Sequence, residues 1–181
     1  MIYLFYPFDD GTALQTLDDL QPGVGGVPGT VASPKIGALY RNDGTYPAGL
    51  WNVGVGDDIF VIGHAAEGMK VLADAQKKQI DQTEVVERLI LCGLPNNVNC
   101  KIVMYACESG KGGPTSLGAK VASSLKTKKY ACQNNVWGFM HKVSTKARRS
   151  AGNALCIEMG KDNWVDYTSQ PHALMNTPPA H

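Results

Sequence analysis

Two side chains with the chemistry of a covalent catalyst, an imidazole and a thiol, each follow a short apolar run. His64 comes directly after residues 59–63, and Cys107 comes directly after residues 102–106. A free thiol is mostly protonated at neutral pH, whereas a thiol beside an imidazole is substantially ionised and is a strong nucleophile. The pair predicts that Cys107 attacks a carbonyl carbon while His64 protonates the departing amine.

The two apolar runs are rich in Val and Ile, which is typical of buried strands in a parallel sheet. Between them, residues 81–94 predict an amphipathic helix, with Asp81 and Glu84 as a capping box, Gly93 at its end, and an apolar face of Val85, Val86, Leu89 and Ile90. Strand, helix and strand make a right-handed unit whose strands end at the same edge of the sheet. We therefore expect His64 and Cys107 to lie within one or two strand spacings, roughly 5 to 10 Å.

A glycine-rich turn over residues 108–114 follows Cys107, and a second helix follows the turn. Thr115 or Ser116 is the expected cap of this helix, and its apolar face contains Leu117, Val121 and Leu125. Backbone N–H groups in the turn are suited to form half of an oxyanion hole.

The order of these features resembles that of the caspase-like cysteine peptidases, the group of caspases, legumains, clostripains and gingipains. His64 ends one strand, an amphipathic helix follows, and Ala106-Cys107 ends the next strand, with the His and the Cys 43 positions apart. The resemblance covers residues 59–159, and the self-processing peptidase modules of bacterial toxins are the nearest members. It implies a three-layer α/β/α sandwich with a mostly parallel sheet, peptide-bond hydrolysis by a Cys107/His64 dyad, and no metal in catalysis.

The resemblance also implies further site residues. The backbone of Ala65 and Glu108 would bind the oxyanion, although the family usually has Gly where this chain has Ala65, and alanine has fewer backbone conformations available. The substrate pocket would involve Ala106 and the strand after the catalytic Cys, represented here by Val136, Trp137 and Gly138. Such an aromatic, uncharged lining predicts a P1 residue that is not acidic.

Seven basic residues flank the strand expected at residues 130–138, and they could converge on a polyanion: Lys126, Lys128, Lys129, Lys142, Lys146, Arg148 and Arg149. The toxin modules that the chain resembles are activated by inositol phosphates through a basic surface, which implies a similar activator here. The alternative is that these residues form a solvated face. No cofactor is required by the predicted reaction.

Other interpretations stand beside the dyad. Cys92, Cys100, Cys132 and Cys156 are expected to be small core residues, and Ser109 is a rival nucleophile that lacks the G-x-S-x-G pattern. His141 could line a substrate pocket, and no pattern of a metal site is present. The alternative function is a catalytically silent caspase-like module that binds a protein or a polyanionic ligand; an acyl transferase that uses the same dyad is a third.

The composition is that of a soluble globular protein: 181 residues, 44% apolar and 18% charged, with a net charge of +1 that argues against nucleic-acid binding. We expect one domain over 1–181, with a Gly/Pro-rich loop region without regular elements at 9–56 and a flexible tail at 169–181. Further strands are expected at 1–6, 130–138, 154–159 and 164–167, the last as an antiparallel edge.

The expected compartment is the cytoplasm. The apolar run 1–6 is too short for a signal peptide or a membrane span, and five cysteines with a thiol catalyst suit a reducing environment. A bacterial effector or toxin that is secreted without a signal peptide is the alternative. The expected partner is a protein or peptide substrate, with no nucleic acid or membrane, and the oligomeric state is left open.

Overall fold

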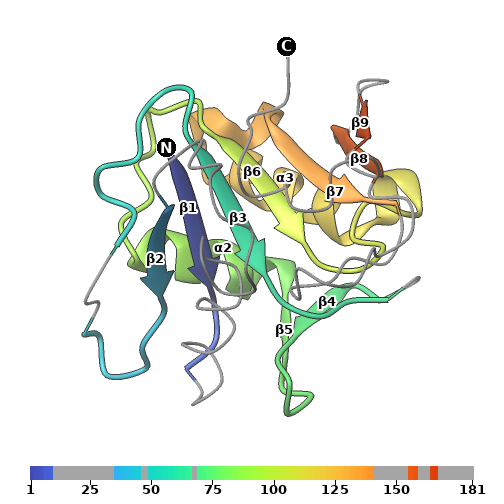
Figure 1. Cartoon of the computed structure of the whole chain (residues 1–181), viewed down its shortest axis with the longest axis horizontal. Helices are drawn as coiled ribbons and strands as arrows, with labels where there is room; N and C mark the ends of the chain where they lie inside the picture. Colours follow the sequence, from blue (N-terminus) through green and yellow to red (C-terminus); the bar gives the residue numbers. More distant parts are fainter. Residues whose placement is uncertain (10–34, 46–48, 67–68, 141–154, 159–163, 167–181) are drawn as a thin grey trace, which may run out of the picture.

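The computed structural model describes residues 1–9, 35–45, 49–66, 69–140, 155–158 and 164–166. These residues contain a sheet with the strand order β2-β1-β3-β6-β7-β8-β9 (Figure 1). Its first five strands are parallel: β2 (Lys35–Leu39), β1 (Ile2–Tyr6), β3 (Asp58–Ile62), β6 (Lys101–Tyr105) and β7 (Val136–Phe139). β8 (Leu155–Glu158) and β9 (Trp164–Asp166) continue the sheet in antiparallel orientation, with β9 at the edge as predicted.

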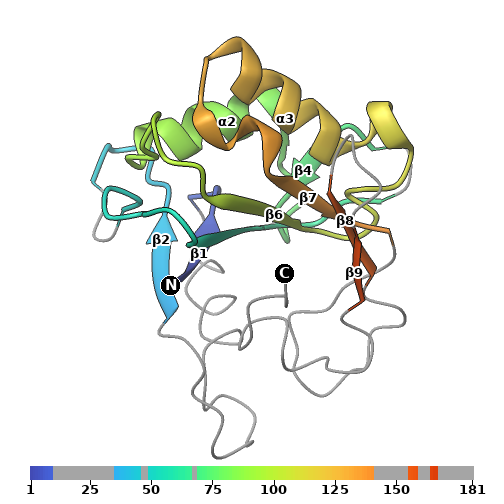
Figure 2. The same cartoon turned by 90° about the horizontal axis from the view of Figure 1, so that it is seen from above.

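Two α-helices connect the central strands, and both were predicted from the apolar pattern. α2 (Gln82–Leu91) begins where the Asp81 side chain accepts a hydrogen bond from the Glu84 N–H (2.9 Å), and it ends before Gly93, whose φ of 92° suits glycine. α3 (Leu117–Thr127) is capped by Ser116, which accepts from the Ala119 N–H (3.2 Å). Figure 2 shows α2 and α3 together on one face of the sheet.

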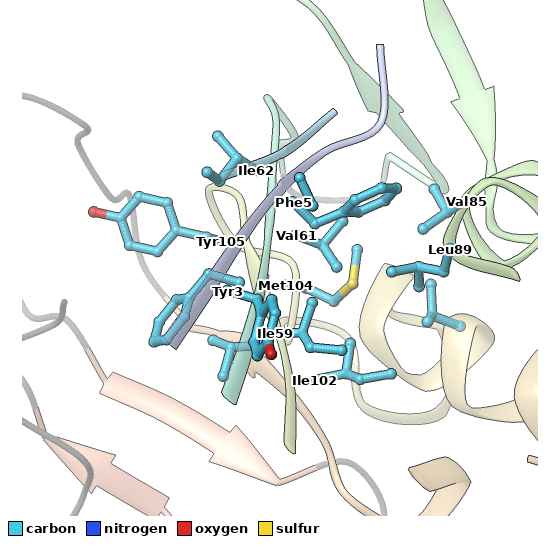
Figure 3. Close-up of a cluster of buried hydrophobic side chains, with 14 of the residues drawn as sticks. Tyr3, Phe5, Ile59, Val61, Ile62, Val85, Leu89, Ile102, Met104 and Tyr105 are labelled. Atoms are coloured by element: carbon cyan, nitrogen blue, oxygen red, sulfur yellow. The ribbon is translucent and has the colours of Figure 1, made fainter. Parts of the chain in front are cut away.

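Side chains of the central strands alternate between the two faces of the sheet. Side chains on the helical face pack against Val85 and Leu89 of α2 (Figure 3). They form two rows across the strands, Phe5, Val61 and Met104 in one and, two positions earlier in each strand, Tyr3, Ile59 and Ile102 in the other. Ile62 and Tyr105 lie on the opposite face and are also buried. Because both faces are buried, the strands are apolar at nearly every position.

The predicted α/β class with a mostly parallel sheet is confirmed. The second helical layer of a three-layer sandwich stays a prediction, because α2 and α3 both cover the same face. The tail at 169–181 lies outside the described residues.

Three parts of the fold differ from the sequence-based expectation. The region 9–56 was expected to lack regular elements, yet it contains β2, which pairs in register with β1. A short hairpin of β4 (Val71–Ala73) and β5 (Gln79–Asp81) precedes α2 and was not predicted. Residues 131–134 form a short 3-10 helix, η2 (Ala131–Asn134), so Cys132 lies in that helix and β7 starts only at Val136. Whether such a short segment forms a strand depends on the strand it pairs with, and the intrinsic strand preference of its residues predicts this poorly.

Candidate functional site

His64 and Cys107 follow neighbouring strands. β3 and β6 are adjacent and parallel, and their last paired residues are Ile62 and Tyr105. The Gly63 N–H donates to the Tyr105 carbonyl (3.4 Å), which extends the contact beyond this pair. His64 and Cys107 each lie two residues past the pair, at strand ends about 4.8 Å apart. The prediction that both leave the same edge of the sheet is therefore confirmed, while a proton-sharing contact between them stays a prediction.

The β4–β5 hairpin holds the backbone of His64. The His64 N–H donates to the Ala73 carbonyl (2.7 Å), and the Ala73 N–H donates to the His64 carbonyl (2.8 Å). Leu72 packs on Gly63 so closely that a Cβ at position 63 would lie 2.6 Å from the Leu72 Cγ. The backbone is thus fixed while the imidazole is exposed to solvent, at the sheet edge where Figure 1 shows the hairpin.

Cys107 differs from the other described thiols in being only half-buried. Cys92, Cys100 and Cys132 are fully buried, as predicted for core residues, and the side chain of Cys156 lies outside the description. Burial raises the pKa of Cys92 to about 12. A hydrogen bond with Cys132, together with burial, raises the pKa of Cys100, and the same hydrogen bond lowers the pKa of Cys132. Of these four thiols, Cys107 is the one that a dissolved substrate can reach.

A tight turn carries Cys107 away from β6. The Ala106 N–H donates to the Met104 carbonyl (2.8 Å), and the Ser109 N–H donates to the Ala106 carbonyl (3.3 Å). Glu108 has a φ of 55°, in the left-handed region that L-residues rarely adopt, and its carboxylate pairs with Lys111 (3.6 Å). Unusual backbone of this kind is often found at functional sites.

The candidate oxyanion donors can be narrowed within this turn. The N–H groups of Ser109, Gly110 and Lys111 donate to the carbonyls of Ala106, Phe139 and Glu108 respectively. These three N–H groups are therefore committed to the fold, and oxyanion binding by Glu108 and Ala65 stays a prediction. Ala65 is not among the described residues with positive φ, so alanine is accommodated there without left-handed strain.

Ser109 is not placed to act as a nucleophile. Its side chain is 1% exposed, its hydroxyl donates to the Met104 carbonyl (2.7 Å), and the Phe139 N–H donates to its oxygen (3.0 Å). A buried hydroxyl with both a donor and an acceptor as partners is a structural group.

The structure places two of the predicted substrate-pocket residues, Val136 and Trp137, away from Cys107. Ala106 and Val136 are fully buried, and Val136 and Trp137 pair with Ile102 and Val103, near the start of β6. At about 3.3 Å per residue these pairs lie more than 10 Å from Cys107 along the strand. Trp137 instead packs over Lys101, whose Nζ is 4.8 Å from the ring centroid, and its Nε1 donates to Asn135 (2.9 Å).

Gly138 has a packing role, and its predicted substrate contact stays a prediction. A Cβ at this position would lie 2.7 Å from the backbone of Gly110 in the turn after Cys107. β7 starts at Val136, later than the predicted strand 130–138, and it ends at Phe139. Met140 directly follows β7 and is partly exposed, so it is a further candidate for a substrate contact that the sequence did not single out.

Three of the seven basic residues belong to the described part of the chain. Lys126 lies in the last turn of α3, and Lys128 and Lys129 follow it, all three exposed. Lys128 pairs with Glu87 of α2 (3.5 Å). Lys142, Lys146, Arg148 and Arg149, like His141, lie outside the described residues, so their convergence stays a prediction.

Two absences concern only the described ranges. No group of three or more His, Cys, Asp or Glu side chains there could hold a metal ion. No helix there combines the length and apolar character needed to cross a membrane.

When the chain was compared with models of protein families and with curated proteins, none matched it.

Proposed function

We propose that this protein is a caspase-like cysteine peptidase in which Cys107 is the nucleophile and His64 the general acid and base. One observation supports the proposal above the others: the two residues follow the paired ends of adjacent parallel strands. The half-buried state of Cys107 and the exposure of the imidazole agree with it, since both groups must meet a substrate.

The proposed reaction has two stages. The Cys107 thiolate attacks the peptide carbonyl carbon, and N–H groups at Ala65 and Glu108 stabilise the negative oxygen that develops. The C–N bond then breaks as His64 protonates the leaving amine, which leaves an acyl group on the sulfur. Water attacks this thioester, His64 accepts the proton of the water, and the C–S bond breaks to release the acid and restore the thiolate.

The substrate class in this proposal is a protein or peptide, and the reaction requires no cofactor. Cleavage of the chain itself, a role as a bacterial effector or toxin domain, and activation by a polyanion at the basic residues belong to the same proposal. The substitution of Ala65 for the usual Gly favours one alternative, a silent module that binds but does not cleave.

Alkylation by iodoacetamide tests the dyad directly. We expect Cys107 to be labelled at neutral pH at least ten times faster than Cys92, Cys100 or Cys132, because these three are buried. His64→Ala should slow the labelling and change its pH dependence, because the imidazole beside the thiol is lost. Mass spectrometry of the digested protein assigns the labelled site, and a peptide library measures hydrolysis in the same samples.

Cys92→Ala is the matched control, since it removes a buried thiol and should leave the rate at Cys107 unchanged. Labelling of Cys107 at the rate of a free thiol, with no effect of His64→Ala, would contradict the enzyme proposal. Dependence on His64 without hydrolysis of any peptide would favour the silent module.

A further inference from the structure

We infer that Ser109 is a positioning residue for Cys107, whose buried hydroxyl holds the turn that presents the thiol. The inference rests on the proposed function of Cys107 and adds to it a residue that touches neither substrate nor reacting atoms.

The Ser109 hydroxyl bridges two strands at a place where a direct backbone hydrogen bond between them is missing from the strand pairing. Pairing of β6 with β7 ends at Met104 and Gly138, because the chain turns away after Tyr105. At this point the Ser109 hydroxyl donates to the Met104 carbonyl (2.7 Å) and accepts from the Phe139 N–H (3.0 Å). One side chain thus joins the end of β6 to the end of β7.

The backbone around Ser109 is anchored as well. The Ser109 carbonyl accepts from the Gly118 N–H in the first turn of α3 (2.9 Å), where helical N–H groups have no partner within the helix. The Gly110 N–H donates to the Phe139 carbonyl (2.9 Å), and Gly110 lies directly against Gly138. Residues 109–110 are therefore fixed by β6, β7 and α3 at once.

These anchors leave little freedom to the two residues before them. Ala106 is fully buried, and its carbonyl accepts from the Ser109 N–H (3.3 Å), so only Cys107 and Glu108 lie between two fixed points. Glu108 takes up a left-handed conformation within this short span. Since a nucleophile must approach the carbonyl carbon to about 3–3.5 Å along a defined direction, loosening the turn should reduce reactivity.

The test compares variants of Ser109 with a matched serine elsewhere. Ser109→Ala and Ser109→Gly remove the hydroxyl, Ser109→Thr keeps it, and Ser116→Ala removes another buried serine hydroxyl, the cap of α3. Each protein is measured for its urea unfolding midpoint and for the rate and pH profile of Cys107 alkylation, with and without His64→Ala.

We expect both variants without the hydroxyl to lose at least ten-fold in the His64-dependent rate, with the pH profile shifted toward that of the His64→Ala protein. Ser109→Thr should recover part of this loss, and Ser116→Ala should lower the unfolding midpoint but leave the rate and profile in place. A folded Ser109→Ala or Ser109→Gly protein with the wild-type rate and profile overturns the inference and leaves the dyad standing. If the alkylation rate of Cys107 in the wild-type protein does not depend on His64, both the inference and the proposed dyad are overturned.

Discussion

Glu108 is one of three described non-glycine residues with a positive φ, together with Lys77 and Lys129, and it is the one next to Cys107. Its φ of 55° places the Cβ close to the following carbonyl oxygen, which costs roughly 1–2 kcal/mol for an L-residue. The Ser109 and Gly110 anchors and the buried Ala106 enforce this conformation, because the turn between them is closed by hydrogen bonds. The energetic cost lies next to the proposed nucleophile, where a fixed thiol direction is needed.

Replacing Glu108 by glycine should therefore stabilise the protein. We expect Glu108→Gly to raise the free energy of unfolding by about 0.5–1 kcal/mol, after subtracting the entropy that glycine gains in the unfolded chain. Glu108→Ala is the control, since it keeps the Cβ and removes only the ion pair with Lys111, a contact worth at most about 1 kcal/mol. Urea unfolding measures both; equal stabilities of the two variants would mean that the strain of the Cβ does not exceed the entropy cost of glycine.

At the scale of elements, the site depends on close contacts between separate segments of the chain. In the hairpin of β4 and β5, Ala73 forms backbone hydrogen bonds with His64, and the Leu72 side chain packs on Gly63. The turn after Cys107 reaches β7 through the contact of Gly110 with Gly138. Glycine is required at both places because a neighbouring group occupies the space of a Cβ.

Gly138→Ala tests the second of these contacts. The added Cβ would lie 2.7 Å from backbone atoms that cannot rotate away, so we expect a loss of about 1–3 kcal/mol in unfolding free energy. The alkylation rate of Cys107 should fall as well, because its turn must move. Gly54→Ala is the control: its Cβ would meet only the Asp57 carboxylate at 3.6 Å, an ordinary contact, and its stability should stay within about 0.5 kcal/mol of wild type. A Gly138→Ala protein as stable as the control would show that the turn is not tightly packed.

The molecule as a whole keeps several ionisable groups neutral inside its core. Burial raises the pKa of Tyr105 and of Cys92, the latter from 9.0 to about 12, and Cys100 is shifted in the same direction. In each case the unfolded chain loses its proton at a lower pH than the folded protein does. The stabilisation is therefore complete below the unfolded pKa and is lost as the pH rises through the folded one.

We accordingly expect the free energy of unfolding to decline between pH 9 and 12, the window set by the Cys92 shift. One such group contributes a slope of up to about 1.4 kcal/mol per pH unit. Cys92→Ala should show a shallower decline whatever its stability at neutral pH, measured by urea unfolding across this range. Parallel curves for the two proteins would contradict a neutral, buried thiol.

The sequence by itself determined β1, β3, β6, α2 and α3, including the cap at Asp81 and the end at Gly93, and it narrowed the cap of α3 to Thr115 or Ser116. These elements depend on apolar periodicity and on hydrogen bonds to residues nearby in the chain, both of which can be seen in a linear sequence. The same information was enough to place His64 and Cys107 at the ends of neighbouring strands.

Only the tertiary structure decided the presence of β2 and of the β4–β5 hairpin, the late start of β7, and the role of Ser109. Short strands owe their existence to a pairing partner, and a residue's distance from the site depends on register, which shifts the position of every following side chain. In the sequence, Ser109 could only be considered as a rival nucleophile. Its structural role was not visible there, because its hydrogen-bond partners, Met104 and Phe139, belong to two different strands that meet only in the folded protein.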